Sequence, residues 1–246
     1  MQIQQATSDT ITQLWSMVEP SVKQSQSLEA AAQAVAEALH TQFEESVVLA
    51  RVYLTSPFDA LPQTNKDFVL KLAESAGAAD DLKAATPVLS LIGSHGQEAD
   101  WCDRRNSKGH VGIPLISSAF VGAIPMISRM LGEFAVPMGF LDSHDTGIII
   151  ENIGSAAGLF FVEDAAEATD REGRKIIAMQ DFVADYSVKS VFGIGCAYDA
   201  GQLLVVVVFC RDAFSRITAE HFLTLANFFK SQTNALVSGQ HIFTNA

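Results

Sequence analysis

The feature that most restricts how this chain can fold is an uninterrupted apolar run near its C-terminus, Leu203–Cys210 (LLVVVVFC). The run is far shorter than the roughly 20 residues that a membrane-spanning helix needs, and its valines favour a strand. Because the run contains no polar position, both of its faces must be covered, so we expect a central strand. Residues 190–198 (SVFGIGCAY) precede it across Asp199-Ala200-Gly201, which predicts an antiparallel hairpin.

Helical periodicity marks both ends of the chain. Apolar residues recur three and four positions apart over residues 9–24, with Ser8 as the expected N-cap and a kink or break expected near Glu19 because of Pro20. Ser27 precedes a run of strong helix formers, SLEAAAQAVAEAL, and is expected to cap a second helix. Thr218 is expected to cap the last helix.

The middle of the chain alternates short strands with loops and helices. We expect strands at 46–54, 87–92, 147–150 and 159–162, short helical pieces within 67–76 and 111–134, and an irregular loop at 93–110. Helices at both ends around a mainly antiparallel sheet make an α+β fold. Without repeats or a low-complexity linker, we expect one domain over 1–246, with an N-terminal helical extension (1–26), a core (27–238) and a tail (239–246).

Composition excludes several classes of function. The 28 acidic and 16 basic side chains give a formal charge of −12, which disfavours nucleic acid as a partner. The polar N-terminus predicts no signal peptide, and no apolar segment predicts a membrane span. Three cysteines without an export signal indicate free thiols, so we expect a cytoplasmic protein.

Residues 160–209 (FFVEDAAEATDREGRKIIAMQDFVADYSVKSVFGIGCAYDAGQLLVVVVF) resemble the second half of a GAF domain. There, a short strand leads to an Asp, a helix, an "SVFG" strand and a hairpin with a "G-x-L" turn. The helices at 27–43 and 218–237 are similar to the first and last helices of that family. The resemblance implies terminal helices on one sheet face and a ligand pocket under loops and short helices on the other.

The resemblance further implies a sensory or regulatory domain rather than an enzyme. Such domains bind small molecules, dimerise through terminal helices and pass a signal to an output domain or a separate partner. The chain departs from known subgroups, because it has no cyclic-nucleotide pattern and no Cys-His pair for bilin attachment. Its cysteines also lack the close grouping of the GAF-type methionine sulfoxide reductases. The resemblance therefore names neither a ligand nor a cofactor, and no functional residue of the family transfers.

The pocket hypothesis rests on residues of the irregular loop and of the segment that follows it. Methionine and aromatic side chains adapt to apolar ligands, and an isolated charge in an apolar stretch can meet an anionic group. Our candidate pocket residues are Trp101, Arg104, His110, Met126 and Arg129. The alternative is that Met126 belongs to ordinary core and that Arg129 pairs with Glu133, four residues on.

Two further functions stay open. His95, Cys102 and His110 carry metal-ligating side chains, so a metal- or haem-dependent sensor is the first, although no tight ligand spacing occurs. A thiol-dependent enzyme is the second, although Cys196 and Cys210 lie in strand patterns where inert thiols are usual. Gly193 and Gly195 share one strand face and predict the close approach of a neighbouring group.

Overall fold

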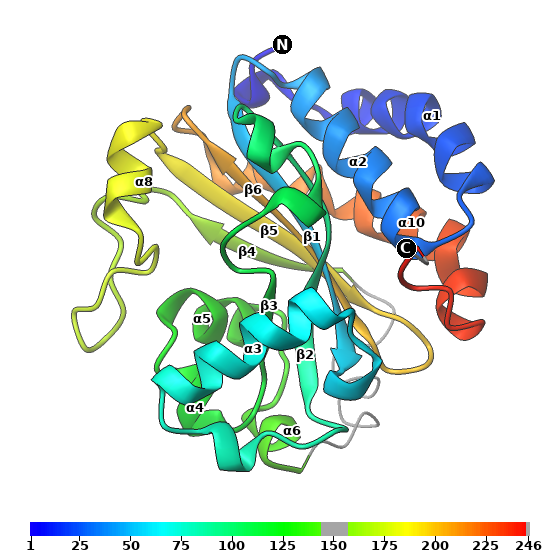
Figure 1. Cartoon of the computed structure of the whole chain (residues 1–246). Coiled ribbons are helices and arrows are strands. Elements are labelled where there is room, and N and C mark those ends of the chain that lie inside the picture. Colours follow the sequence, from blue (N-terminus) through cyan, green and yellow to red (C-terminus); the bar gives the residue numbers. More distant parts are fainter. Residues whose placement is uncertain (144–156, 245–246) are drawn as a thin grey trace.

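The structure is a computed structural model that describes residues 1–143 and 157–244. Its centre is an antiparallel sheet with the strand order β3-β2-β1-β6-β5-β4 (Figure 1). The strands are β1 (Val47–Pro57), β2 (Pro87–Gly96), β3 (Gly112–Pro114), β4 (Gly158–Val162), β5 (Ser190–Ala197) and β6 (Leu203–Cys210). The predicted α+β class and antiparallel sheet are therefore confirmed.

Strand β6 is central, as its uniform apolarity predicts. It pairs with β1 on one side and with β5 on the other, and β5 and β6 form the expected hairpin. Its side chains alternate between two cores, with Leu204, Val206 and Val208 on one face and Leu203, Val205 and Val207 on the other. Each fully buried aliphatic side chain contributes about 1.5–3 kcal/mol to stability. Strand β6 therefore stabilises the hydrophobic cores on both faces of the sheet.

Helices cover the two faces unequally. On one face lie α1 (Ser8–Gln24), α2 (Leu28–Gln42) and α10 (Leu223–Ser238), with α9 (Arg216–Glu220) leading into α10 (Figure 1). The other face carries short helices and loops, namely α4 (Ser118–Gly122), α5 (Pro125–Glu133), α6 (Met138–Ser143) and α8 (Gln180–Asp185). Helix α3 (Gln63–Ser75) packs beside β3. Among the helices described, none has the length and apolarity needed to span a bilayer.

Three helix predictions need correction. Helix α1 is not broken near Glu19 but continues through Pro20, because Val18 and Val22 on either side stay buried and their packing outweighs one lost backbone hydrogen bond. Its N-cap is Thr7 rather than Ser8, since the Thr7 side chain accepts the amide hydrogen of Thr10. At the other end, Ser215 and not Thr218 caps α9. Ser27 caps α2 as predicted, accepting from the amide of Ala30 at 3.1 Å.

Strand β2 extends beyond its predicted end at Gly93. A Cβ at Gly93 would lie 2.6 Å from the carbonyl carbon of Ala32, so this glycine allows α2 to approach the sheet and does not end the strand. Residues 93–96 of the predicted irregular loop therefore continue β2, and the rest contains two short 3₁₀ turns, Ala99–Trp101 and Arg104–Asn106. The strand expected at 147–150 lies outside the described residues.

Candidate functional site

A cavity of about 300 Å³ lies on the sheet face opposite the terminal helices. Strands β1, β2 and β6 form its floor, the segment 100–110 and the residues around 176–182 form its sides, and α5 lies over it. Most of its lining is aliphatic or aromatic. This volume is at the lower end of the range of small-molecule sites, about 300–1,000 Å³.

The segment 100–110 contributes an aromatic wall through Trp101. The Trp101 ring lies 4.8 Å from the Tyr186 ring and 5.7 Å from the Phe182 ring, measured between centroids. Gly96 makes room for it, because a Cβ there would come within 2.9 Å of the indole. Trp101 and Phe182 both border the cavity, so this aromatic group fixes one side of the site.

Helix α5 is held over the cavity by an aromatic residue at its end. Phe134 packs where Gly158 of β4 and Gly195 of β5 lack side chains, since a Cβ at either glycine would lie within 2.7 Å of its ring. The close approach predicted at Gly195 is therefore confirmed, and the approaching group is Phe134. This contact positions Met126 and Met130 of α5 in the lining.

The floor holds a charged residue that the sequence analysis did not select, Arg51 of β1. Arg51 is only 7% exposed and alternates with Leu49 and Tyr53, which also line the cavity. Its Nη1 donates to the carbonyl oxygen of Gly109 at 3.0 Å and lies 3.5 Å from the Tyr53 hydroxyl. The signal was present in SVVLARVYL, where Arg51 is the one charged residue of a predicted buried strand.

His110 borders the cavity next to Arg51. Its backbone has a φ of 56°, in the left-handed region that few non-glycine residues adopt and that often marks a functional position. The ring keeps solvent-accessible surface, but surrounding protein removes much of its hydration, which lowers the pKa of His110, and the charge of Arg51 lowers it further. At neutral pH His110 is therefore an uncharged polar group.

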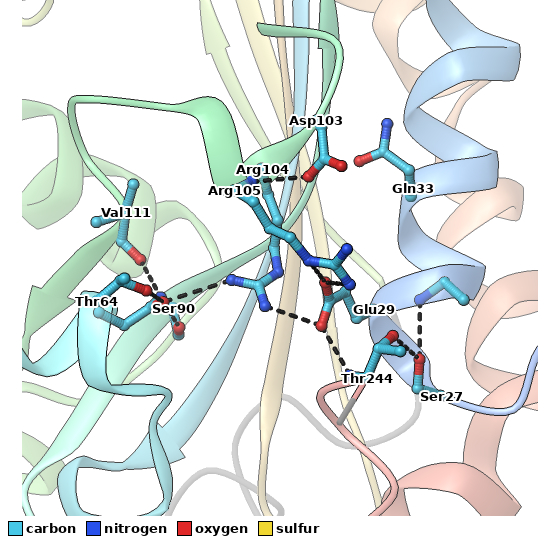
Figure 2. Close-up of polar contacts among 12 residues, drawn as sticks. Ser27, Glu29, Gln33, Thr64, Ser90, Asp103, Arg104, Arg105, Val111 and Thr244 are labelled. Atoms are coloured by element: carbon cyan, nitrogen blue, oxygen red, sulfur yellow. Dashed lines mark hydrogen bonds and ion pairs between the residues drawn. The ribbon is translucent and has the colours of Figure 1, made fainter. Parts of the chain in front are cut away.

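The structure places Arg104 outside the cavity. Its Nη2 lies 2.8 Å from Glu29 Oε2, and Arg105 Nη2 lies 2.9 Å from Glu29 Oε1 (Figure 2). The same carboxylate accepts the backbone amide of Thr244 at 2.8 Å. Burial by itself would raise the pKa of Glu29, but the hydrogen bonds from Arg104 and Thr244 and the charges of both arginines outweigh it and lower that pKa. Arg104 thus joins α2 to the C-terminal tail.

That tail is part of the fold. The carbonyl oxygens of His241 and Ile242 accept the amide hydrogens of Leu28 and Glu29, both at 2.8 Å. These amides belong to the first turn of α2 and have no partner within the helix. The segment 239–246, expected as a tail, therefore supplies hydrogen-bond acceptors for the first backbone amides of α2.

Arg129 also lies outside the cavity and makes the alternative contact expected for it. Its Nε donates to Glu133 Oε1 at 2.8 Å, and its Nη2 donates to the carbonyl oxygen of Phe161 at 2.7 Å. Glu133 Oε2 accepts the amide of Phe161 at 3.1 Å. Phe161 belongs to the edge strand β4. The Arg129–Glu133 pair therefore forms hydrogen bonds with backbone groups of β4 that are otherwise available to a further strand.

The three residues considered for a metal site have different surroundings. The His95 ring packs 5.0 Å from the His40 ring, the Cys102 thiol donates to the carbonyl oxygen of Gly96, and His110 borders the cavity. Within residues 1–143 and 157–244, no three His, Cys, Asp or Glu side chains group in a way that could hold a metal ion.

Two of the three thiols are poor nucleophiles. Burial raises the pKa of Cys196 to about 12, against a small opposing effect of Lys230, and burial raises the pKa of Cys210 well above its ordinary value. Since the thiolate is the reactive form, both side chains are inert near neutral pH. Cys102 is exposed.

Comparison with known proteins gives a match in structure but not in sequence. No protein-family model and no curated protein sequence matches the chain. Among solved structures, the phycoerythrobilin-bound GAF domain of a cyanobacterial phytochrome superposes with a TM-score of 0.50 at 10% identity, over 94% of this chain and 98% of that one. The GAF domain of a phosphoenolpyruvate-protein phosphotransferase from Coxiella burnetii gives a TM-score of 0.50 at 10% identity, over 96% and 99%. The chain has a GAF-like fold.

In this fold, three of the five candidate pocket residues lie around the cavity and two lie elsewhere. Trp101, His110 and Met126 come together around one cavity on the face away from the terminal helices, whereas Arg104 and Arg129 serve ion pairs elsewhere. The arginine that lines the cavity is Arg51, and neither Arg104 nor Arg129 belongs to the lining. Ligand binding by this set stays a prediction.

Proposed function

We propose that this chain is a sensory or regulatory domain that binds a small molecule in the cavity formed by Trp101, His110 and Met126. The observation that carries the proposal is the apolar cavity of about 300 Å³ on the sheet face that the terminal helices leave free. A concave apolar site with a few convergent polar groups is typical of ligand recognition. The GAF-like fold supports the proposal, since a similar domain is bilin-bound.

The test is native mass spectrometry of the purified protein, followed by release and identification of any bound small molecule. Met126→Trp places a large side chain in the cavity lining, and we expect it to abolish or strongly reduce the bound mass. Ile217→Trp is the control, because Ile217 lies on α9, does not line the cavity and is 69% exposed. A bound mass that survives in both variants would show that the ligand occupies another site.

The proposal also includes how the domain dimerises and passes on its signal. We expect a cytoplasmic homodimer that associates through its terminal helices and signals to a separate partner or output domain. Helices α1 and α10 pack against each other, and Met17 is a large apolar side chain on the exposed side of this layer. Analytical ultracentrifugation at several concentrations measures the dimer, and a Met17→Glu variant should weaken it. A strictly monomeric protein would contradict this part of the proposal.

A further inference from the structure

Arg51 is a buried cation without a counter-ion. It is 7% exposed, and among the described residues no carboxylate lies within 4.0 Å of its guanidinium group. Removing a charge from water is expensive unless an opposite charge or a full set of hydrogen bonds replaces the hydration. Arg51 lies on the cavity floor between Leu49 and Tyr53, where an anionic group of a ligand would compensate its charge.

The hydrogen bonds of Arg51 leave one edge of the guanidinium group free. Nη1 is used by the carbonyl oxygen of Gly109, while the buried Nε has no partner and Nη2 donates to none of the described residues. Nε and Nη2 point along one edge of the planar group. This edge matches the two oxygens of a carboxylate, which arginine binds through a pair of parallel hydrogen bonds.

The other charges of the lining do not neutralise Arg51. Lys108 and Asp100 also border the cavity, but they form an exposed ion pair with each other, with 2.6 Å between Nζ and Oδ2. His110 is neutral near pH 7, and the Tyr53 hydroxyl oxygen is an uncharged acceptor that lies 3.5 Å from Arg51 Nη1. The cavity therefore offers one uncompensated positive charge, which fits one negative charge on a ligand.

The remainder of the lining is apolar. The other side chains that line the cavity are aliphatic, thioether or aromatic, among them Ile113, Met126, Ile177, Phe182 and Phe209. A small, strongly hydrated anion would lose its hydration here without compensation. An apolar body attached to the anionic group would instead bury its surface against these side chains.

We propose that the cavity binds a small monocarboxylic acid with an aryl or alkyl body, its carboxylate paired with the guanidinium group of Arg51. This inference rests on the proposed function and deepens it by naming the chemical class of the ligand. A phosphate monoester carries up to two negative charges near neutral pH and has three terminal oxygens. A single guanidinium group among apolar side chains suits a carboxylate better.

The experiment compares isosteric probes by isothermal titration calorimetry on the full chain. Phenylacetate and octanoate are measured against phenylacetamide and octanamide, which keep the shape but lack the charge, and phenyl phosphate is a further probe. We expect at least one acid to bind about tenfold or more tightly than its amide, because a charge-assisted bidentate contact is lost in the amide.

Arg51→Met removes the charge and keeps a long apolar side chain. The acid should then lose about tenfold or more in affinity, while the amide binds equally well or better. Arg51→Lys retains the charge without the planar fork and should give an intermediate loss for the acid. Arg171→Met, at an exposed position, is the matched control and should leave every affinity unchanged. Circular dichroism verifies that each variant is folded.

The outcomes separate this inference from the proposed function. Equal affinities for acid and amide, acid selectivity that persists in Arg51→Met, or tighter binding of phenyl phosphate than of both acids would overturn the carboxylate inference while leaving a ligand-binding cavity. If no probe binds and native mass spectrometry finds no bound molecule, the proposed function fails as well.

Discussion

Two buried guanidinium groups in this fold have opposite surroundings. Arg104 is 8% exposed and has Glu29 at 2.8 Å, whereas Arg51 is 7% exposed and has no carboxylate within reach in the described part of the chain. The first pair joins α2, the segment 104–106 and the C-terminal tail (Figure 2). The second group lines the cavity. The comparison teaches that the burial of a charge alone does not define its role: Arg104 holds parts of the fold together through Glu29, whereas Arg51 lines a cavity.

The largest expected effect comes from breaking the paired region. Glu29→Ala leaves the buried charge of Arg104 uncompensated, so we expect the free energy of unfolding to fall by about 3–5 kcal/mol. Urea denaturation followed by circular dichroism measures it. Glu37→Ala, on an exposed position of the same helix, is the control and should change stability by no more than about 0.5 kcal/mol.

The same pair has a predictable dependence on pH. The pKa of Glu29 is lowered in the fold from a value of 4.5, so its contribution to stability is complete above pH 4.5 and is lost as the pH falls through the folded pKa. The difference in stability between wild type and Glu29→Ala should therefore shrink in acid. A loss below about 1 kcal/mol at neutral pH would contradict the importance of this pair.

The second-largest expected effect concerns Arg51, whose removal should not lower the free energy of unfolding. Arg51→Met removes a buried charge that has no carboxylate partner among the described residues, so without ligand we expect the free energy of unfolding to stay unchanged or to rise by about 1 kcal/mol. The same urea titration, run after the protein has been stripped of any bound molecule, measures it. A loss comparable to that of Glu29→Ala would mean that Arg51 supports the fold, and the contrast between the two arginines would disappear.

The smallest expected effect is a shift in the pKa of His110. Burial and, to a lesser degree, Arg51 lower the pKa of His110 from 6.5. In Arg51→Met we expect this pKa to rise while remaining below 6.5, because burial persists. Proton NMR titration of the histidine ring signals in wild type and Arg51→Met measures it. An unchanged pKa would place the His110 ring beyond the influence of Arg51.

The sign of the corresponding stability change follows from proton linkage. Between the lowered pKa of His110 and 6.5, the unfolded chain binds more protons than the folded one. The contribution of a neutral His110 is therefore present above pH 6.5 and is lost as the pH falls. Removing Arg51 should reduce this loss.

Local patterns sufficed for the regular elements. The apolar run of β6 required cover on both faces, and the cap at Ser27 placed α2 within a residue of its observed start. Patterns failed where neighbours from elsewhere in the chain outweighed a local preference. Pro20 is tolerated because its helix packs on both sides of it, and Gly93 serves the approach of α2.

The candidate site was predicted only in part. Trp101, His110 and Met126 do line one cavity, since all three come from the segments that roof this sheet face. Arg104 was chosen as a residue of the polar loop and Arg129 as an isolated charge. Both have an acidic partner, and sequence spacing identified only the partner of Arg129. Arg51 was missed because a predicted strand shows which residues share a face, but not what lies above that face.

The sequence by itself determined the alternation of elements, the centrality of β6 and the class of the fold, because these depend on hydrophobic periodicity and capping within short windows. The spacing of four residues predicted the Arg129–Glu133 pair, but only the tertiary structure decided which charges distant in sequence are paired. Glu29 and Arg105 are 76 positions apart and still meet, whereas Arg51 meets no acid among the described residues. Coulomb attraction depends on distance in space, and that distance is set only when the layers of the fold pack together.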